Sequence, residues 1–295
     1  MNYSSEKTAF KNVIINADDY GITKGVNRAI EKLIDAGIVT STSVMSNMPY
    51  LANIHNLKDS VGFGVHFNLT IGKPIGAPDS IPSIVNERGE FNNFSTLMRN
   101  MKRGILSKKE VENEFQLQVG AIIEKGIMPD HVDSHQSLLK YPFFERIIRK
   151  IANKYRISAV RTYRPLKFDY TRLLSIKKVL KSIYLSYQRI KWKNDGFSVV
   201  DKYDSLLKFG LNFNDALQRL HEMFNRMSSG IYEIAVHPGY CNDNRDNLGA
   251  YVCEREIELE ALLSIEFRKI LESSKPRLIR FADIAENINT EQRTI

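Results

Sequence analysis

Four short polar clusters, each lying directly after an apolar, strand-like run, constrain the fold of this chain more than any other feature. The clusters are residues 16–21, 66–68, 131–135 and 237–240. They hold four of the six histidines and the adjacent carboxylates of Asp18 and Asp19. In α/β folds the carboxyl ends of the strands are where catalytic groups collect. The pattern therefore predicts an α/β fold that gathers ligands for a metal ion, of the kind used in hydrolysis, at one end of its sheet.

Strand-like and helix-like patterns alternate along the chain. Apolar runs with β-branched residues predict strands near residues 12–16, 39–45, 61–66, 130–133, 158–162, 231–236 and 277–280. Helical spacing and capping residues predict helices that end at Gly37, begin at Ser107 and Pro142, and lie near residues 171–192, 213–228 and 254–272. Residues 72–100 are predicted to be a long connection from a strand to a helix. This alternation predicts a single-domain, distorted or incomplete (β/α) TIM-like barrel over residues 1–295.

Hydropathy and cysteine content bear on the compartment of the protein. The chain has no run of 18 apolar residues, and residues 1–11 lack the apolar stretch of a signal peptide, so we expect no membrane span and no secretion signal. With only Cys241 and Cys253, we expect no disulfide framework and a cytoplasmic location. Cys241 lies four residues after His237, where it could be a soft zinc ligand or an inert small residue.

The net charge of +8 is concentrated in one segment. Residues 146–193 contain 15 Lys and Arg and one acid, Asp169, whereas the rest of the chain is mildly acidic. We therefore do not expect the chain as a whole to bind nucleic acid. We expect residues 146–193 to form a basic helical excursion from the barrel. Its amphipathic helix could be solvated, contact a second copy of the chain, or dock on an anionic membrane or an acidic glycan.

The pair Asp18–Asp19 carries the sharpest chemical signal. At the end of a strand, one carboxylate can hold a cation while its neighbour faces the substrate and acts as a general base on water. The alternative is that one of the two caps the helix that begins after Gly21.

The histidines of the other clusters have similar alternatives. His66 could be a metal ligand or a hydrogen-bonded core residue. His131 and His135 are four residues apart, which suits one face of a helical turn, and Asp133 between them could orient a metal-bound imidazole. His237 precedes a Pro-Gly turn, so it could transfer protons or be an ordinary turn residue.

Arg161 also ends a strand-like run. Its guanidinium could bind a developing oxyanion or a substrate oxygen. A structural ion pair inside the barrel is equally consistent with this position.

Taken in order, the four clusters resemble the motifs of the YdjC-like carbohydrate deacetylase family, which includes chitooligosaccharide and hopanoid-associated deacetylases. The matching sequences are NADDYG at residues 16–21, GVHFNLT at 64–70, HVDSH at 131–135 and VHPG at 236–239. The resemblance covers nearly the whole chain. It implies a distorted (β/α) barrel that binds one divalent cation, often as a homodimer. It also implies hydrolysis of the N-acetyl group of an amino sugar, with release of acetate.

The resemblance also implies roles for individual residues. Asp19, His66 and His135 match the metal ligands, Asp18 matches the general base, and His237 matches the general acid for the departing amine. The cation would be Mg²⁺ or Zn²⁺, because one carboxylate and two imidazoles tolerate either, and imidazoles favour zinc.

The residue spacing and the family pattern disagree about one histidine. The HxxxH spacing alone nominates both His131 and His135 as ligands. The family pattern keeps only His135, and we follow it, placing His131 and Asp133 behind the ligands.

Two other functions are compatible with the same residues. A metal-dependent phosphoesterase could use the same Asp and His residues, and a sugar- or lipid-surface-binding protein could keep the barrel without catalysis.

Many family members have a histidine-rich run after the third motif, whereas this chain has Gln-Ser-Leu-Leu at residues 136–139. We expect a more apolar wall beside the metal. With the basic segment, this favours a larger, lipid-linked or polymer-linked N-acetyl sugar over free chitobiose.

Overall fold

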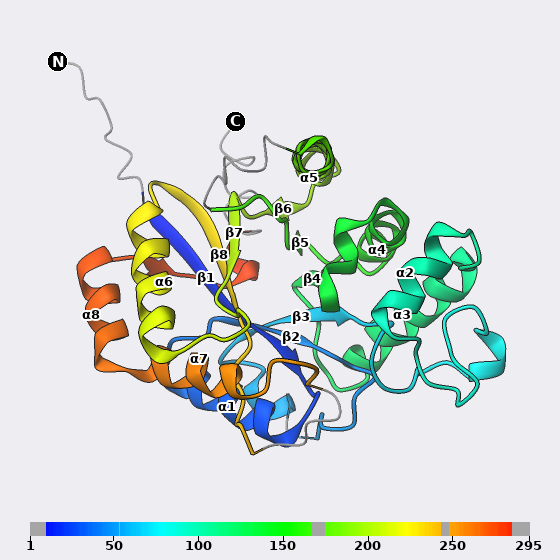
Figure 1. Cartoon of the computed structure of the whole chain (residues 1–295), viewed down its shortest axis with the longest axis horizontal. Helices are drawn as coiled ribbons and strands as arrows, with labels where there is room; N and C mark the ends of the chain where they lie inside the picture. The colour runs from blue at the N-terminus through cyan, green and yellow to red at the C-terminus, as the bar shows by residue number, and fades with distance from the viewer. Residues whose placement is uncertain (1–9, 53, 167–174, 243–247, 285–295) are drawn as a thin grey trace.

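A single parallel sheet forms the centre of the molecule (Figure 1). The computed structural model describes residues 10–52, 54–166, 175–242 and 248–284. The strand order is β6-β5-β4-β3-β2-β1-β8-β7, and β9 pairs with the first part of β1. The strands are β1 (Lys11–Tyr20), β2 (Ser41–Val44), β3 (Gly62–Phe67), β4 (His131–Ser134), β5 (Ala159–Val160), β6 (Ser198–Val199), β7 (Lys202–Ser205), β8 (Gly230–Val236) and β9 (Arg277–Leu278).

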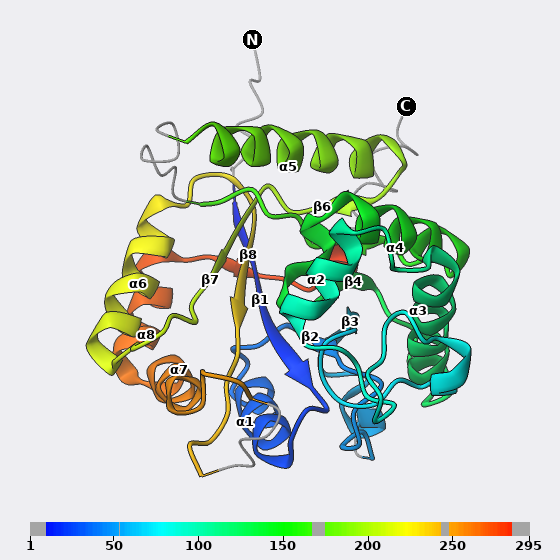
Figure 2. The same ribbon diagram turned by 45° about the vertical axis from the view of Figure 1, so that its right-hand side comes forward.

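Helices surround the sheet on its outer side, and α5 lies across one edge of the molecule (Figure 2). The α-helices are α1 (Lys24–Asp35), α2 (Phe94–Lys102), α3 (Lys108–Ile123), α4 (Pro142–Lys154), α5 (Ile176–Asn194), α6 (Phe213–Arg226), α7 (Cys253–Leu263) and α8 (Ile265–Ser274). Three short 3₁₀ helices are η1 (Ile54–Leu57), η2 (Pro78–Ser80) and η3 (His135–Lys140). Among the described residues, no helix is both long and apolar enough to cross a membrane.

The sheet curls into an incomplete (β/α) barrel, which confirms the predicted fold class. Its two edge strands, β6 and β7, do not pair with each other. Instead, the segment after β5 approaches β7 through an isolated parallel bridge between Pro165 and Tyr203. All strand pairings are parallel, so the carboxyl ends of the strands lie at one end of the barrel.

Helix α1 shows how the local sequence produces these elements. The side chain of Thr23 accepts a hydrogen bond from the Val26 amide and caps the first turn. Ile30 and Leu33 follow at helical spacing and are fully buried against the sheet. Gly37 has a φ of 67°, the left-handed conformation that ends many helices. The predicted helix and its end are both confirmed.

Several elements differ from the prediction. The predicted connection at residues 72–100 includes η2 and most of α2, and α2 was not expected. Strands β6 and β7 were not expected, because they are short and β7 is polar. The predicted helix at 254–272 is two helices, since Ser264 has extended backbone and its side chain caps α8. The predicted helix at 171–192 is α5, and residues 171–174 lie outside the described part of the chain.

Candidate active site

A bulge at the end of β1 places two consecutive carboxylates inside the barrel. Ala17 pairs with Thr42 of β2, but the next pair is Tyr20 with Val44, so β1 carries one extra residue there. Asp19 has a φ of 71°, a left-handed conformation that Asp tolerates better than most residues. Asp18 and Asp19 are both buried. The irregular backbone therefore lets neighbouring side chains face different partners.

The Asp19 carboxylate lies among two histidines and an arginine. Its Oδ1 is 3.0 Å from His135 Nδ1 and 3.3 Å from His66 Nε2, and its Oδ2 accepts a hydrogen bond of 2.7 Å from Arg255. Burial alone would raise the pKa of Asp19, but the charge of Arg255 and the contacts with His135 outweigh it and hold this pKa well below its usual range. Asp19 is therefore ionised at neutral pH.

Asp19, His66 and His135 suit a divalent cation. Their candidate ligand atoms all lie within 4.8 Å of one another. Atoms that bond to one ion at about 2.0–2.2 Å must themselves lie within roughly twice that bond length of one another, so the three side chains are close enough to share an ion. The Nδ1 of His66 is 2.7 Å from Asp133 Oδ1, which leaves its Nε2 directed toward Asp19. The Nε2 of His135 is buried without a hydrogen-bond partner among the described residues.

A second group of potential ligands is already neutralised by a guanidinium. Asp18, His66 and Asp133 also bring ligand atoms within 4.8 Å of one another. However, Arg161 forms ion pairs of 2.6 Å with Asp18 and 2.8 Å with Asp133. Because this guanidinium occupies the place a cation would take, the group containing Asp19 is the better candidate metal site.

Arg161 is the centre of a buried ion-pair network. It donates two hydrogen bonds to Asp18, at 2.7 and 2.6 Å, and one of 2.7 Å to Glu233 on β8. Burial would lower the pKa of Arg161, but Asp133, Asp18 and Glu233 raise it well above its ordinary value. One guanidinium serves three carboxylates, and burial raises the pKa of Glu233 to about 7. Of the two sequence-based alternatives, the geometry matches the structural ion pair.

His237 follows β8 and faces Asp18. Its Nε2 lies 3.5 Å from Asp18 Oδ2, and burial lowers its pKa to about 4, so the imidazole is neutral at pH 7. Its backbone N–H donates a hydrogen bond to the Glu258 carboxylate of α7. Burial raises the pKa of Glu258 to about 8.

His131 lies deeper in the barrel than the candidate site. It belongs to strand β4, whereas His135 begins η3, so the four-residue spacing does not place both on one helical face. The His131 ring contacts Ser43 and stacks on Phe281 at 4.0 Å between ring centres. A Cβ at Gly64 would lie 2.2 Å from that ring, so glycine is required there. His131 is not in the group around Asp19, as expected.

A cavity of about 900 Å³ opens onto these residues. Asp18, Asp19, His66, His135, Arg161 and His237 all line it. Gln136 and Ser137 line it as well, whereas Leu138 and Leu139 are fully buried in the core. The wall that replaces the histidine-rich run is therefore polar and neutral, and less apolar than expected.

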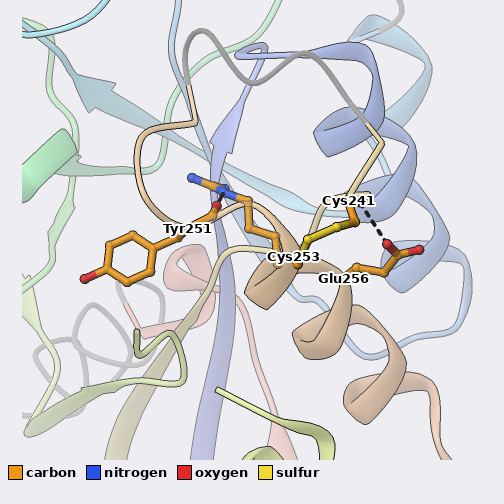
Figure 3. Close-up of a disulfide and its surroundings, with 5 residues drawn as sticks. Cys241, Tyr251, Cys253 and Glu256 are labelled. Atoms are coloured by element: carbon orange, nitrogen blue, oxygen red, sulfur yellow. Dashed lines mark hydrogen bonds between the residues drawn. A yellow bond between two sulfur atoms is a disulfide. The ribbon is translucent and has the colours of Figure 1, made fainter. Parts of the chain in front are cut away.

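A disulfide joins Cys241 to Cys253 beside the site, contrary to the expectation of unpaired cysteines (Figure 3). The bond links the segment after β8 to the first turn of α7. Its sulfurs are not ligands, so the suggested zinc role for Cys241 is wrong. The Cys241 amide donates a hydrogen bond to Glu256, and the Tyr251 carbonyl accepts one from Arg255.

Three charged residues of the site were not predicted from the sequence. Arg255 contacts Asp19, Glu233 contacts Arg161, and Glu258 contacts the backbone of His237. Glu233 lies in the middle of β8. A carboxylate among apolar strand residues was the one feature of the sequence that could have indicated a role for it in the site. Arg255 and Glu258 lie on α7, where helical spacing alone does not mark a residue of the site.

Comparison with known proteins places the chain in a family. A family profile described as YdjC-like protein matches residues 12–273. The carbohydrate deacetylase of Thermoanaerobacter pseudethanolicus is 30% identical over 261 residues, which cover 85% of this chain and 90% of that protein. The carbohydrate deacetylase of Halalkalibacterium halodurans is 30% identical over 257 residues, covering 86% and 96%.

A solved structure shares the fold. It is a crystal structure from Enterococcus faecalis, provisionally described as a cellobiose-phosphate cleavage protein. It has a TM-score of 0.72 and 25% sequence identity, and the match covers 93% of this chain and 98% of that one. The chain belongs to the YdjC-like protein family.

Proposed function

We propose that this protein is a metal-dependent carbohydrate deacetylase that hydrolyses the N-acetyl group of an amino sugar and releases acetate. Two independent observations support the proposal. The relatives reported above are named carbohydrate deacetylases. The cavity brings a candidate metal site and a separate carboxylate, Asp18, to the same wall.

Asp19, His66 and His135 would hold one divalent cation, Mg²⁺ or Zn²⁺. One carboxylate with two imidazoles accepts either ion, and imidazoles favour zinc. When bound, the ion would polarise the amide carbonyl and lower the pKa of the attacking water. Asp133 would orient His66 through the hydrogen bond to Nδ1.

The proton transfers would belong to Asp18 and His237. Asp18 would accept a proton from the attacking water as general base. His237 is neutral at the start, so it cannot donate a proton until it has received one. Its Nε2 is 3.5 Å from Asp18 Oδ2, close enough to take that proton and pass it to the departing amine. The pair would thereby work as base and acid in sequence.

Arg161 would keep Asp18 ionised and correctly oriented. Its two hydrogen bonds fix both oxygens of the Asp18 carboxylate. Contact between Arg161 and the substrate oxyanion stays a prediction.

The observation that carries the proposal is that Asp18 is bonded to Arg161 whereas Asp19 lies beside His66 and His135. The test is to reconstitute the protein with Mg²⁺ or Zn²⁺ and measure acetate and free amine from N-acetylglucosamine oligosaccharides, with p-nitrophenyl phosphate in parallel. We expect acetate and amine in equal amounts and no metal-dependent phosphate. Phosphate release without acetate would favour a phosphoesterase. Binding of the glycan with neither product would favour a non-catalytic protein.

A further inference from the structure

The outward face of α5 carries an apolar stripe. Ile176, Leu180, Ile183, Tyr187 and Ile190 are 79%, 60%, 60%, 58% and 55% exposed. They follow one another at alternating spacings of four and three residues, so they lie on one side of the helix. The other large apolar residues exposed in the described chain are scattered over several elements. The stripe is therefore a continuous surface, and such surfaces mark interaction sites.

The opposite side of α5 attaches the helix to the protein. Only Leu185, Gln188 and Trp192 are buried in this helix of 19 residues. Gln188 donates a hydrogen bond of 2.7 Å to the Leu139 carbonyl. Lys178 and Lys181, outside the stripe, line the same cavity as the candidate metal ligands. The helix thus buries its smaller apolar face and exposes its larger one.

The charge of α5 has one sign. Its sequence, IKKVLKSIYLSYQRIKWKN, contains six Lys and Arg and no acid. Lys177 and Lys193 are exposed and form no ion pair with the described residues. Both views place α5 at the periphery of the molecule (Figures 1 and 2). Arg189 pairs with Asp201, but no side chain in the described part of the chain pairs with Lys177 or Lys193 or packs over the stripe.

Two kinds of partner could cover this face. A second copy of the chain that packed stripe against stripe would bring two wholly basic helices together, and like charges repel. An anionic lipid bilayer would bury the apolar side chains and attract the lysines. Charge complementarity therefore favours the bilayer.

We propose that α5 docks the protein on the surface of an anionic membrane. The helix would lie in the interface with its stripe among the lipid headgroups and acyl chains, and with Lys177 and Lys193 near the lipid phosphates. It is too polar to span the bilayer. If the chain is the deacetylase proposed above, docking through α5 would bring the cavity close to acetylated sugars carried by that membrane. The docking itself does not depend on this activity.

The test is co-sedimentation of the full chain with vesicles. We expect the wild-type protein to bind equimolar phosphatidylcholine–phosphatidylglycerol vesicles, to bind phosphatidylcholine vesicles weakly, and to dissociate as salt is raised. This comparison needs no variant. Equal recovery with both vesicle types, or no binding to the anionic vesicles, would overturn the proposal.

Variants identify the surface. Leu180→Glu with Ile183→Glu should weaken binding at least about tenfold, because two apolar anchors are lost. Ile265→Glu, at a similarly exposed isoleucine on α8, should bind as wild type. Unchanged binding of the double variant would overturn the assignment to α5.

Lysine variants test whether the charges of α5 contribute to membrane binding. Lys177→Gln with Lys193→Gln should weaken binding to the anionic vesicles about fivefold per lysine, whereas Lys108→Gln with Lys109→Gln on α3 should not.

Sedimentation equilibrium without lipid tests whether a second copy of the chain covers the stripe instead. A wild-type dimer that the Leu180→Glu, Ile183→Glu variant dissociates, together with no vesicle binding, would assign the stripe to a dimer and overturn the proposal.

Discussion

Asp18 and Asp19 are adjacent in the chain, yet their carboxylates have different partners. Asp18 accepts two hydrogen bonds from Arg161, whereas Asp19 lies 3.0 Å from His135 Nδ1 and 3.3 Å from His66 Nε2. The bulge in β1 lets both carboxylates reach the same cavity, because a regular strand would point one of the two side chains to the outer face of the sheet. A base and a metal ligand can therefore come from consecutive residues.

The Asp18→Asn variant should separate these two roles. We expect it to bind metal as wild type but to lose turnover by about 10²–10⁴-fold, the usual contribution of a general base. The measurement is kcat for acetate release alongside metal content per chain. Thermal unfolding serves as a control, because Arg161 loses one of its three charged partners in this variant. Normal turnover with normal metal content would remove Asp18 from the mechanism.

Asp133→Asn should weaken the site without removing a ligand. The variant loses the carboxylate that fixes the ring of His66, and such changes cost about 10–100-fold in metal affinity or activity. The measurement is metal affinity by competition with a chromophoric chelator. An affinity equal to wild type would show that Asp133 does not orient His66.

Glu258 should make the stability of the metal-free protein depend on pH. Burial raises its folded-state pKa to about 8 from the ordinary value of 4.5, so the folded state binds a proton that the unfolded state releases. The associated stability is fully present below pH 4.5 and is lost as pH rises through about 8.

The Glu258→Gln variant lacks this titration. Relative to wild type, its free energy of unfolding should rise on the order of a few kcal/mol between about pH 5 and about pH 9. Urea unfolding of both proteins across this range gives the difference. A constant difference would mean that the pKa of Glu258 is not raised.

The disulfide should contribute to stability. Cys241 and Cys253 are 12 residues apart, and closing a loop of this size stabilises the folded state by about 3 kcal/mol in the chain-entropy account. The Cys241→Ser, Cys253→Ser variant should lose about this amount in urea unfolding, and reductant should lower wild-type stability to the same value. If wild type is unaffected by reductant and equals the variant, the two cysteines are not bonded.

Much of the barrel could be predicted because its elements carry strong local signals. Helix α1 combines the Thr23 cap, an apolar face and Gly37, and all three act within a few residues of each other. Strand β8 is a run of apolar residues around Glu233. The clusters at residues 16–21, 66–68 and 237–240 lie at strand ends, as expected, since parallel strands present their carboxyl ends together. The cluster at 131–135 differs, because residues 131–134 form β4 itself and only His135 follows it.

The remainder depends on contacts between distant residues. Strand β7 is polar and forms because β8 offers it a partner. The contact between Arg255 and Asp19 joins residues that are 236 positions apart, and the disulfide depends on how α7 meets the segment after β8. No short stretch of sequence specifies these contacts, because they arise from tertiary packing.

Locating the bound ion is the decisive test of the metal site formed by Asp19, His66 and His135. Crystals of wild-type protein grown with Zn²⁺ should show one anomalous peak bonded to Asp19, His66 and His135 at about 2.0–2.2 Å. The His135→Ala variant should lose that peak, whereas His55→Ala, at an exposed histidine, should keep it. A peak bonded to Asp18 and Asp133 instead, or no peak at saturating Zn²⁺, would show that Asp19, His66 and His135 do not hold the ion.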